Sequence, residues 1–205
     1  MNLLKTCFKG LKQILLRKVN IIAGALLLSL LLSSDALSDR FNETSFKQEF
    51  KNSVTLYMPA YDYIWLVAQC RQESSFDPYA MSPAGAEGYC QFMPDTWLDC
   101  QLKLGFVAPR SDAGKNIRCA AWYMGSRVEV WGGRNRTASE KLPLAQASYN
   151  CGTGCVLKAQ KRCEDGRVFE DIVPCLPKET QEYPIKISKF YDIFVGKIRS
   201  VCYGS

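Results

Sequence analysis

The sequence predicts a mostly helical α+β domain, and three observations support this fold class. Apolar residues recur at helical spacing in several stretches, Gly and Pro residues end these stretches, and the turn-rich segment 78–94 is typical of a loop or a small hairpin. The 205 residues give room for one ordinary domain. With 47% hydrophobic and 22% charged residues, the composition excludes a disordered, collagenous or coiled-coil chain.

Two helices are predicted before residue 78. The polar lead-in segment 39–57 contains a short helix over residues 39–54. Residues 58–71 form an amphipathic helix, because apolar side chains recur at i, i+3, i+4 and i+7, namely Tyr61, Ile64, Trp65 and Ala68. Pro78 ends this region, because a residue that precedes a proline avoids the helical conformation.

Four more helices are predicted in the rest of the chain, over residues 96–104, 115–131, 144–149 and 179–203. Residues 156–178 are expected to be irregular. The four tryptophans lie at helical spacing and are expected in the core rather than as platforms for sugar rings. They are Trp65, Trp97, Trp122 and Trp131.

Residues 1–38 are typical of a secretory signal. Basic residues up to Lys18 precede the uncharged run 21–32, and Ala36-Leu37-Ser38 has the small-x-small form that a signal peptidase accepts. The apolar run is shorter than the about 20 residues that a membrane-spanning helix needs. An uncleaved signal anchor is the alternative, and both interpretations place the rest of the chain outside the cytoplasm, as a periplasmic or exported domain.

The charge and the missing histidines exclude several functions. The formal net charge is +6, but residues 1–38 carry +4 of it and the other 167 residues only +2. This small excess disfavours a nucleic-acid partner. Because the chain has no histidine, it cannot contain a Ser/His or Cys/His hydrolase site or a His-ligated metal centre.

The cysteines after residue 38 indicate a disulfide framework in an exported domain. There are nine, so at least one is free or bonds to another chain. Cys163 and Cys175 flank a turn-like segment and are the most plausible local pair. A zinc site at Cys151 and Cys155 is disfavoured, because the CxxC spacing is absent and Gly-Thr-Gly between them suits a turn.

Without histidine, proton transfer must be carried out by carboxylates, tyrosines or lysines. Glu73 is the most interesting carboxylate, because it lies in the last turn of an apolar-faced helix, where the negative end of the helix dipole disfavours ionisation. Burial beside Phe76, Phe92 or Tyr149 would raise its pKa in the same direction. The alternative is a solvated glutamate with no special role.

Four segments around Glu73 resemble the motifs of one enzyme family. They are ESSFDP at 73–78, GAEGYCQFMP at 85–94, ASYNCGTG at 147–154 and ETQEY at 179–183. In this order they resemble the lytic transglycosylases of the soluble lytic transglycosylase type. The resemblance covers about residues 58–200 and implies a lysozyme-like domain of the goose type over residues 58–205.

The resemblance also implies roles for individual residues. Glu73 matches the family's single catalytic acid/base. Ser82 and Gln91 match polar residues that contact the substrate's N-acetyl groups, and Met93 matches an apolar wall of the cleft. Tyr149 and Asn150 match the pair that forms the cleft floor. Tyr183 matches a tyrosine that lies near the catalytic carboxyl. No metal or organic cofactor is implied.

This sequence departs from the family pattern at five positions. Tyr89 and Cys90 replace the usual Leu and Met, Ser148 and Cys151 replace two alanines, and Pro184 replaces a frequent valine. A disulfide between Cys90 and Cys151 would join two walls of the cleft, which is a hypothesis, because connectivity cannot be derived from sequence. Tyr89, Phe92 and Tyr149 are the best candidates for stacking on sugar rings.

The implied reaction cleaves the bond between N-acetylmuramic acid and N-acetylglucosamine in peptidoglycan glycan strands and closes a 1,6-anhydro ring. It consumes no water, so one carboxylate suffices, unlike the usual two-carboxylate glycosidase. If Glu87 held a water across the cleft, the protein would be a muramidase instead; an exposed loop charge is the favoured interpretation of Glu87. An inactive wall-binding component of an envelope machine is another alternative. A secretion or conjugation apparatus, a phage and general wall remodelling remain open as settings.

Overall fold

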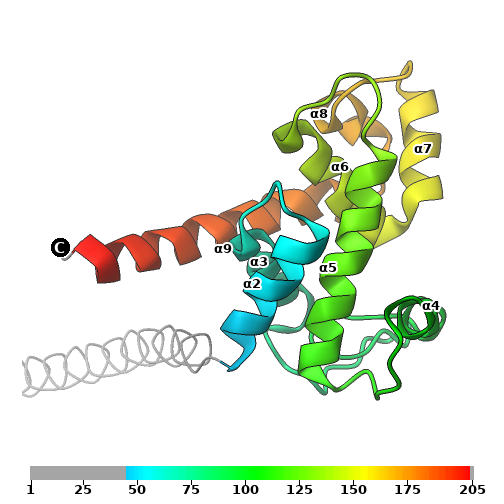
Figure 1. Ribbon diagram of the computed structural model, residues 1–205. Coiled ribbons are helices and arrows are strands. Elements are labelled where there is room, and N and C mark those ends of the chain that lie inside the picture. The colour runs from blue at the N-terminus through cyan, green and yellow to red at the C-terminus, as the bar shows by residue number, and fades with distance from the viewer. Residues whose placement is uncertain (1–44, 204–205) are drawn as a thin grey trace, which may run out of the picture. The chain divides into compact units, whose positions relative to one another are not determined.

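The computed structural model describes residues 45–203, which form a helical domain (Figure 1). The elements in chain order are α2 Ser45–Tyr57, α3 Tyr63–Ser74, α4 Pro94–Leu104, α5 Ala113–Val130, α6 Ala138–Cys151, α7 Thr153–Arg162, α8 Phe169–Ile172, the 3-10 helix η1 Val173–Cys175 and α9 Lys178–Tyr203. Between residues 45 and 203 the only β structure is two isolated bridges, from Glu87 to Met81 and to Phe92. The signal and anchor predictions for residues 1–38 lie outside the described residues.

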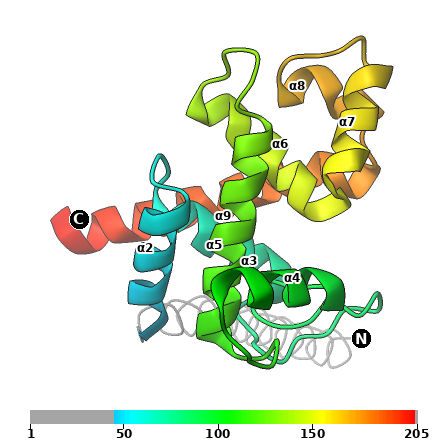
Figure 2. The same cartoon turned by 45° about the vertical axis from the view of Figure 1, so that its right-hand side comes forward.

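Helix α5 runs through the middle of the domain, next to α2, α4 and α6 (Figures 1 and 2). Asp112 begins α5, because its side chain accepts a hydrogen bond from the backbone N–H of Lys115. Gly125 allows α2 to approach closely, since a Cβ atom at this position would lie 2.3 Å from the backbone oxygen of Tyr57. Small buried residues at 120, 121 and 125 therefore explain the close contact between α2 and α5.

Helix α3 packs along α9 and ends abruptly. Its N-cap is Asp62, whose carboxylate accepts from the backbone N–H of Ile64, and Trp65 stacks on Tyr191 of α9 with ring centroids 3.9 Å apart. At the other end, Ser75 and Phe76 both adopt positive φ, 56° and 67°. This left-handed turn stops the helix directly after its last turn and sends the chain into the loop 77–93.

Gly88 and Asn116 fix the base of this loop. Gly88 has a φ of +89°, and a Cβ atom there would lie 2.2 Å from the backbone oxygen of Arg110, so only glycine fits. The fully buried Asn116 of α5 accepts from the backbone N–H of Cys90 at 2.8 Å and donates to the same Arg110 oxygen at 2.8 Å. The loop is therefore attached to α5 through a buried amide.

Four disulfides join Cys70 to Cys90, Cys100 to Cys119, Cys151 to Cys155 and Cys163 to Cys175. The predicted pair of Cys163 and Cys175 is confirmed. The hypothesis of a bond between Cys90 and Cys151 is wrong, because Cys90 bonds to Cys70 of α3 and Cys151 bonds to Cys155 of α7. The alternative zinc site is also wrong, since both of its thiols are used in a disulfide.

The region after residue 137 is more helical than predicted. Helix α6 begins six residues earlier than expected, because Thr137 and Glu140 form a capping box. Residues 156–178, expected to be irregular, contain most of α7 and all of α8. Gly152, with a φ of +84°, separates α6 from α7.

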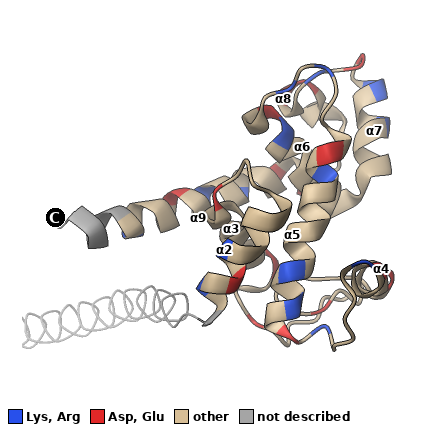
Figure 3. Cartoon of the chain, viewed as in Figure 1, with Lys and Arg blue, Asp and Glu red and all other residues tan. Residues whose placement is uncertain are grey.

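No helix between residues 45 and 203 combines the length and apolar character that crossing a membrane requires. Figure 3 shows that the acidic and basic residues are interspersed along the described elements.

Candidate active site

A pocket of about 540 Å³ lies where the C-terminal ends of α3 and α6 meet the N-terminal end of α9 and the loop 82–93. It is lined by twelve residues, which include every site residue that the sequence predicts: Glu73, Ser82, Gln91, Met93, Tyr149, Asn150 and Tyr183. The other lining residues are Gln72, Pro83, Ala84, Ala86 and Glu179. The structure therefore brings predicted site residues that are up to 110 positions apart in sequence into one pocket.

The carboxyl group of Glu73 is half-buried in the last turn of α3, and the hydroxyl of Tyr183 donates a hydrogen bond to its Oε1 atom. Burial raises the pKa of Glu73 from 4.5 to about 7. The hydrogen bond from Tyr183 lowers this pKa, and the negative charge of Glu179 raises it. Because burial outweighs the hydrogen bond, a large fraction of Glu73 keeps its proton at neutral pH, as a general acid must.

Two tyrosines enclose Glu73 as neutral phenols. Burial, followed by the nearby charge of Glu73, raises the pKa of both Tyr149 and Tyr183 well above 10. The hydroxyl of Tyr149 donates to the backbone oxygen of Cys90 at 2.7 Å, and its ring contacts Phe92 edge-on. These contacts hold the phenol of Tyr149 in place between α6 and the loop.

Gln91 and Ser82 organise the loop wall of the pocket. Gln91 has a φ of 55°, an unfavourable conformation for a residue with a side chain, and its Nε2 atom donates to the backbone oxygens of Ala80 and Gly88, each at 3.0 Å. The hydroxyl of Ser82 accepts from the backbone N–H of Ala86 at 3.0 Å. A hydroxyl that accepts one hydrogen bond can still donate another, so Ser82 is able to contact a ligand.

Met93 supplies an apolar part of the pocket wall. Met93 is 43% exposed and lies at the N-cap of α4. An exposed methionine can pack against the apolar face of a ligand without a fixed shape requirement.

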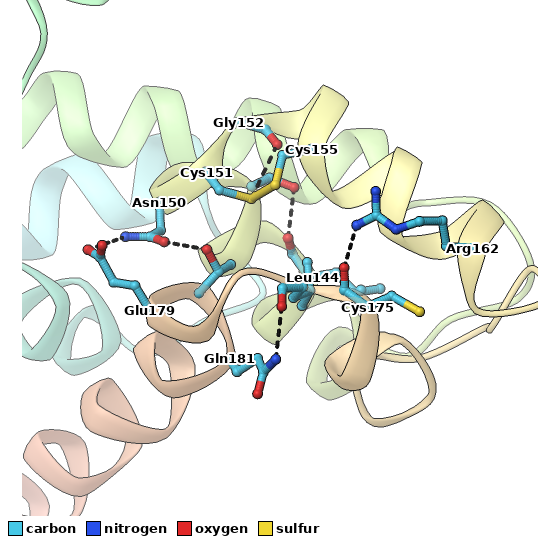
Figure 4. The surroundings of a disulfide bond; sticks show 12 residues. Leu144, Asn150, Cys151, Gly152, Cys155, Arg162, Cys175, Glu179 and Gln181 are labelled. Carbon is cyan, nitrogen blue, oxygen red and sulfur yellow. Dashed lines mark hydrogen bonds between the residues drawn. A yellow bond between two sulfur atoms is a disulfide. The ribbon is translucent and has the colours of Figure 1, made fainter.

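Asn150 joins the ends of α6 and α9 (Figure 4). Its Nδ2 atom donates to Oε1 of Glu179 at 3.3 Å, and its Oδ1 atom accepts from the hydroxyl of Thr180 at 2.7 Å. Sequence reasoning missed Glu179 as a pocket residue. The signal that could have found it is its spacing from Tyr183, because residues four apart lie on the same face of a helix.

Glu87 is neither an exposed charge nor a residue of the pocket. Its carboxylate pairs with the guanidinium of Arg110 at 2.7 Å, and Arg110 also donates to the backbone oxygens of Gly85 and Phe92. The favoured interpretation of Glu87 as a solvated loop charge is therefore wrong, and so is the alternative in which it holds a water in the cleft. It is a structural ion pair that supports the loop.

Two of the three predicted sugar-stacking rings lie in the core. Tyr89 is 6% exposed and packs among Phe46, Phe50 and Phe76, and Phe92 is 2% exposed. Only Tyr149 lines the pocket.

The core prediction for the tryptophans is right for Trp97 and Trp131, which are 5% and 2% exposed. Trp65 and Trp122 are only partly buried.

Within residues 45–203, no group of three or more Cys, Asp and Glu side chains is arranged to hold a metal ion.

A carboxyl of raised pKa in a polar pocket, at the end of a packed helix, is an arrangement typical of proton-transfer enzymes and makes this pocket a candidate active site. The fold is the lysozyme-like fold of lytic transglycosylases. An inactive mutant of the lytic transglycosylase Slt from Pseudomonas aeruginosa superposes with a TM-score of 0.62 at 24% identity, over 77% of this chain and 25% of that one.

Residues 52–170 match the family described as the transglycosylase SLT domain, and the chain belongs to this family. It is 30% identical over 184 residues to membrane-bound lytic murein transglycosylase D of Escherichia coli K12. This alignment covers 79% of this chain and 38% of that protein. It is 30% identical over 147 residues to membrane-bound lytic murein transglycosylase F of Shewanella frigidimarina, covering 70% and 28%. The chain thus spans well under half the length of these relatives.

Proposed function

We propose that this chain cleaves the glycan strands of peptidoglycan as a lytic transglycosylase, with Glu73 as its acid/base. The observation that carries the proposal is the half-buried carboxyl of Glu73 with a pKa of about 7, in contact with the hydroxyl of Tyr183. Membership of the SLT family and the murein transglycosylases among its relatives support the substrate class.

In the first step, protonated Glu73 donates its proton to the glycosidic oxygen between N-acetylmuramic acid and N-acetylglucosamine, and the bond from this oxygen to the anomeric carbon breaks. The muramyl N-acetyl oxygen stabilises the positive charge that develops at that carbon. Ser82 and Asn150 line the pocket with groups that can hydrogen-bond an acetamido group, and Met93 supplies an apolar surface.

In the second step, ionised Glu73 accepts the proton of the C6 hydroxyl, and the C6 oxygen forms a bond to the anomeric carbon. The product is a 1,6-anhydro ring, no water is consumed, and Glu73 is protonated again. The hydrogen bond from Tyr183 stabilises the ionised form that exists between the two steps. One carboxyl of pKa near 7 can therefore act first as acid and then as base.

We test this by incubating the 205-residue chain with purified sacculi and identifying the products by mass spectrometry. Anhydromuropeptides are the expected products. Muropeptides with a reducing-end muramic acid would instead show a hydrolase, and an absence of soluble products would show a wall-binding component.

Glu73→Gln should lose activity by about a hundredfold to ten-thousandfold, because the amide cannot donate a proton to the leaving oxygen. Glu182→Gln is the matched control, since Glu182 is partly exposed, pairs with Lys178 and Lys186, and does not line the pocket. Equal activity of Glu73→Gln and the control would overturn the assignment of the acid.

We also propose that the domain is exported, on the strength of the signal-like residues 1–38. Sequencing the N-terminus of the chain recovered from the cell envelope should give a start at Asp39. A start at Met1 in membrane fractions would support the uncleaved anchor instead. Peptidoglycan is the proposed partner, and a secretion apparatus, a conjugation apparatus and a phage remain open as settings.

A further inference from the structure

Glu179 is the second carboxylate of the candidate active site. Among the twelve residues that line the pocket, Glu73 and Glu179 are the only acids, and none is a lysine or arginine. Glu179 is exposed, whereas Glu73 is half-buried. An exposed carboxylate keeps its hydration and stays charged at little cost, so the two acids meet different conditions in one pocket.

Glu179 and Tyr183 are the two residues of α9 that line the pocket, together with Glu73. Glu179 lies in the first turn of the helix, where the positive end of the helix dipole favours a negative charge. Tyr183 follows four residues later on the same face of α9, and its hydroxyl contacts Glu73. One face of α9 thus presents both the hydrogen-bond partner of Glu73 and a negative charge beside it.

Asn150 holds the carboxylate of Glu179 in this position. The Asn150 amide donates to Glu179 and accepts from Thr180, so its orientation is fixed from two adjacent residues of α9 (Figure 4). Because a hydrogen bond to this amide restricts the rotamers of Glu179, its negative charge stays closer to one position than the charge of a free surface glutamate does.

The neighbouring charges leave the effect of Glu179 on Glu73 uncompensated. Lys178 points to Glu182, with Nζ 3.4 Å from Oε1, and the guanidinium of Arg71 lies over the ring of Phe190. The loop wall contributes no charged side chain to the pocket, and the two tyrosines that face Glu73 are neutral. The negative charge of Glu179 accordingly raises the pKa of Glu73 and disfavours its ionisation.

We propose that Glu179 is a positioning residue for the acid: its charge, held at the pocket wall by Asn150, keeps the proton on Glu73 until the glycosidic oxygen takes it. This inference rests on the proposed role of Glu73. It assigns to α9 two opposing effects on one carboxyl, since Tyr183 favours the ionised form and Glu179 the protonated form. Both forms of Glu73 are needed in the two-step reaction, so the balance between them sets the working pH range.

The test is a direct titration of Glu73 by carbon NMR in the full chain with labelled glutamate side chains, with Glu73→Gln used to assign the signal. Glu179→Gln should lower the titration midpoint of Glu73. For each half pH unit by which the midpoint falls below about 7, the rate on sacculi at pH 8 should fall about 2.5-fold relative to that at pH 6. Raising the salt concentration should move the wild-type midpoint in the same direction, because salt screens an exposed charge.

Three variants separate this effect from a loss of structure. Asp192→Asn removes an exposed negative charge from the same helix outside the pocket and should leave the midpoint unchanged. Glu179→Asp should restore it, and Thr180→Val, which loosens Asn150 without removing a charge, should shift it less than Glu179→Gln. An unchanged midpoint in Glu179→Gln would overturn the proposal. The titration needs no turnover, so an inactive wild-type chain would refute the proposed function and leave this result interpretable.

Discussion

The hydrogen bond from Tyr183 to Glu73 connects two residues 110 positions apart and opposes the effect of burial on the same carboxyl. The net pKa of about 7 shows that burial dominates. A rise from 4.5 to about 7 corresponds to about 3 kcal/mol between the two protonation states, which is more than an ordinary hydrogen bond contributes. Glu73 is therefore an acid with a raised pKa, and it can donate its proton near neutral pH.

Tyr183→Phe should raise the pKa of Glu73 further, because the variant removes the one hydrogen bond that favours the ionised form. The alkaline limb of the pH–rate profile should move to higher pH, while the maximal rate falls because the second step requires ionised Glu73. The measurement is the rate on sacculi from pH 5 to pH 9. A limb that moves to lower pH would contradict this account of the pair.

Glu73 should also make the fold less stable at alkaline pH. Its folded pKa, about 7, lies above its unfolded value of 4.5, so its stabilising contribution is complete below pH 4.5 and is lost as the pH rises through 7. Between pH 4 and pH 8 the wild type should lose about 3 kcal/mol more unfolding free energy than Glu73→Gln. Urea unfolding of both chains at the two pH values measures this difference, and equal losses would show an ordinary, solvated carboxyl.

At the scale of elements, the loop 77–93 positions two of the pocket residues, Ser82 and Gln91, by attachments outside the pocket. The disulfide from Cys70 ties the loop to α3, and Asn116 ties it to α5. Gly88 lies between these attachments, where the backbone of Arg110 leaves no room for a side chain. The geometry of the pocket wall therefore depends on packing against helices that contribute no residue to the pocket.

Gly88→Ala should destabilise the domain by about 2 kcal/mol or more, because it forces a backbone shift and places alanine at a φ of +89°. Gly133→Ala is the control, since a Cβ atom at Gly133 meets no atom within 4 Å and no positive φ is required there. Urea denaturation measures both. Similar midpoints for the two variants would show that the loop can relax around Gly88.

Sequence reasoning reached the seven proposed site residues through the resemblance of their motifs to those of the soluble lytic transglycosylases, and all seven line one pocket. It misplaced Tyr89, Phe92 and Glu87 because motif spacing does not show which side of a loop packs on the core. It also missed Glu179 as a pocket residue, because that role depends on where α9 begins relative to α6.

The helix predictions were correct where apolar periodicity is strong and failed where capping decides. Helix α5 was expected at 115–131 and lies at Ala113–Val130. Helix α7 was missed because Gly152 suggests a turn and the following residues are rich in Lys and Gln. The residues that α7 buries are Val156, Ala159 and Gln160, so its apolar pattern is weak. Among the disulfides, the local pair of Cys163 and Cys175 was predicted, whereas the bonds of Cys70 to Cys90 and of Cys100 to Cys119 depend on elements that meet in three dimensions. The bond between Cys151 and Cys155 is also local, and sequence reasoning missed it.

At the scale of the whole molecule, the disulfides between residues 45 and 203 differ in the length of chain that they close. The bond between Cys70 and Cys90 closes a segment of 20 residues and joins α3 to the pocket loop, whereas that between Cys151 and Cys155 closes only 4. Replacing Cys70 and Cys90 by Ala should therefore cost more, about 3 kcal/mol, than replacing Cys151 and Cys155, about 2 kcal/mol. Thermal unfolding of the two double variants under oxidising conditions measures the order, and a reversed order would contradict it.

The central claim is that the Glu73 carboxyl holds its proton near neutral pH, and titrating this carboxyl in the wild-type chain by carbon NMR tests it most directly. The account predicts a midpoint near 7 for the one signal that disappears in Glu73→Gln. A midpoint near 4.5, the value of a solvated glutamate, would contradict it, because a carboxyl that is ionised at neutral pH has no proton to give to the glycosidic oxygen.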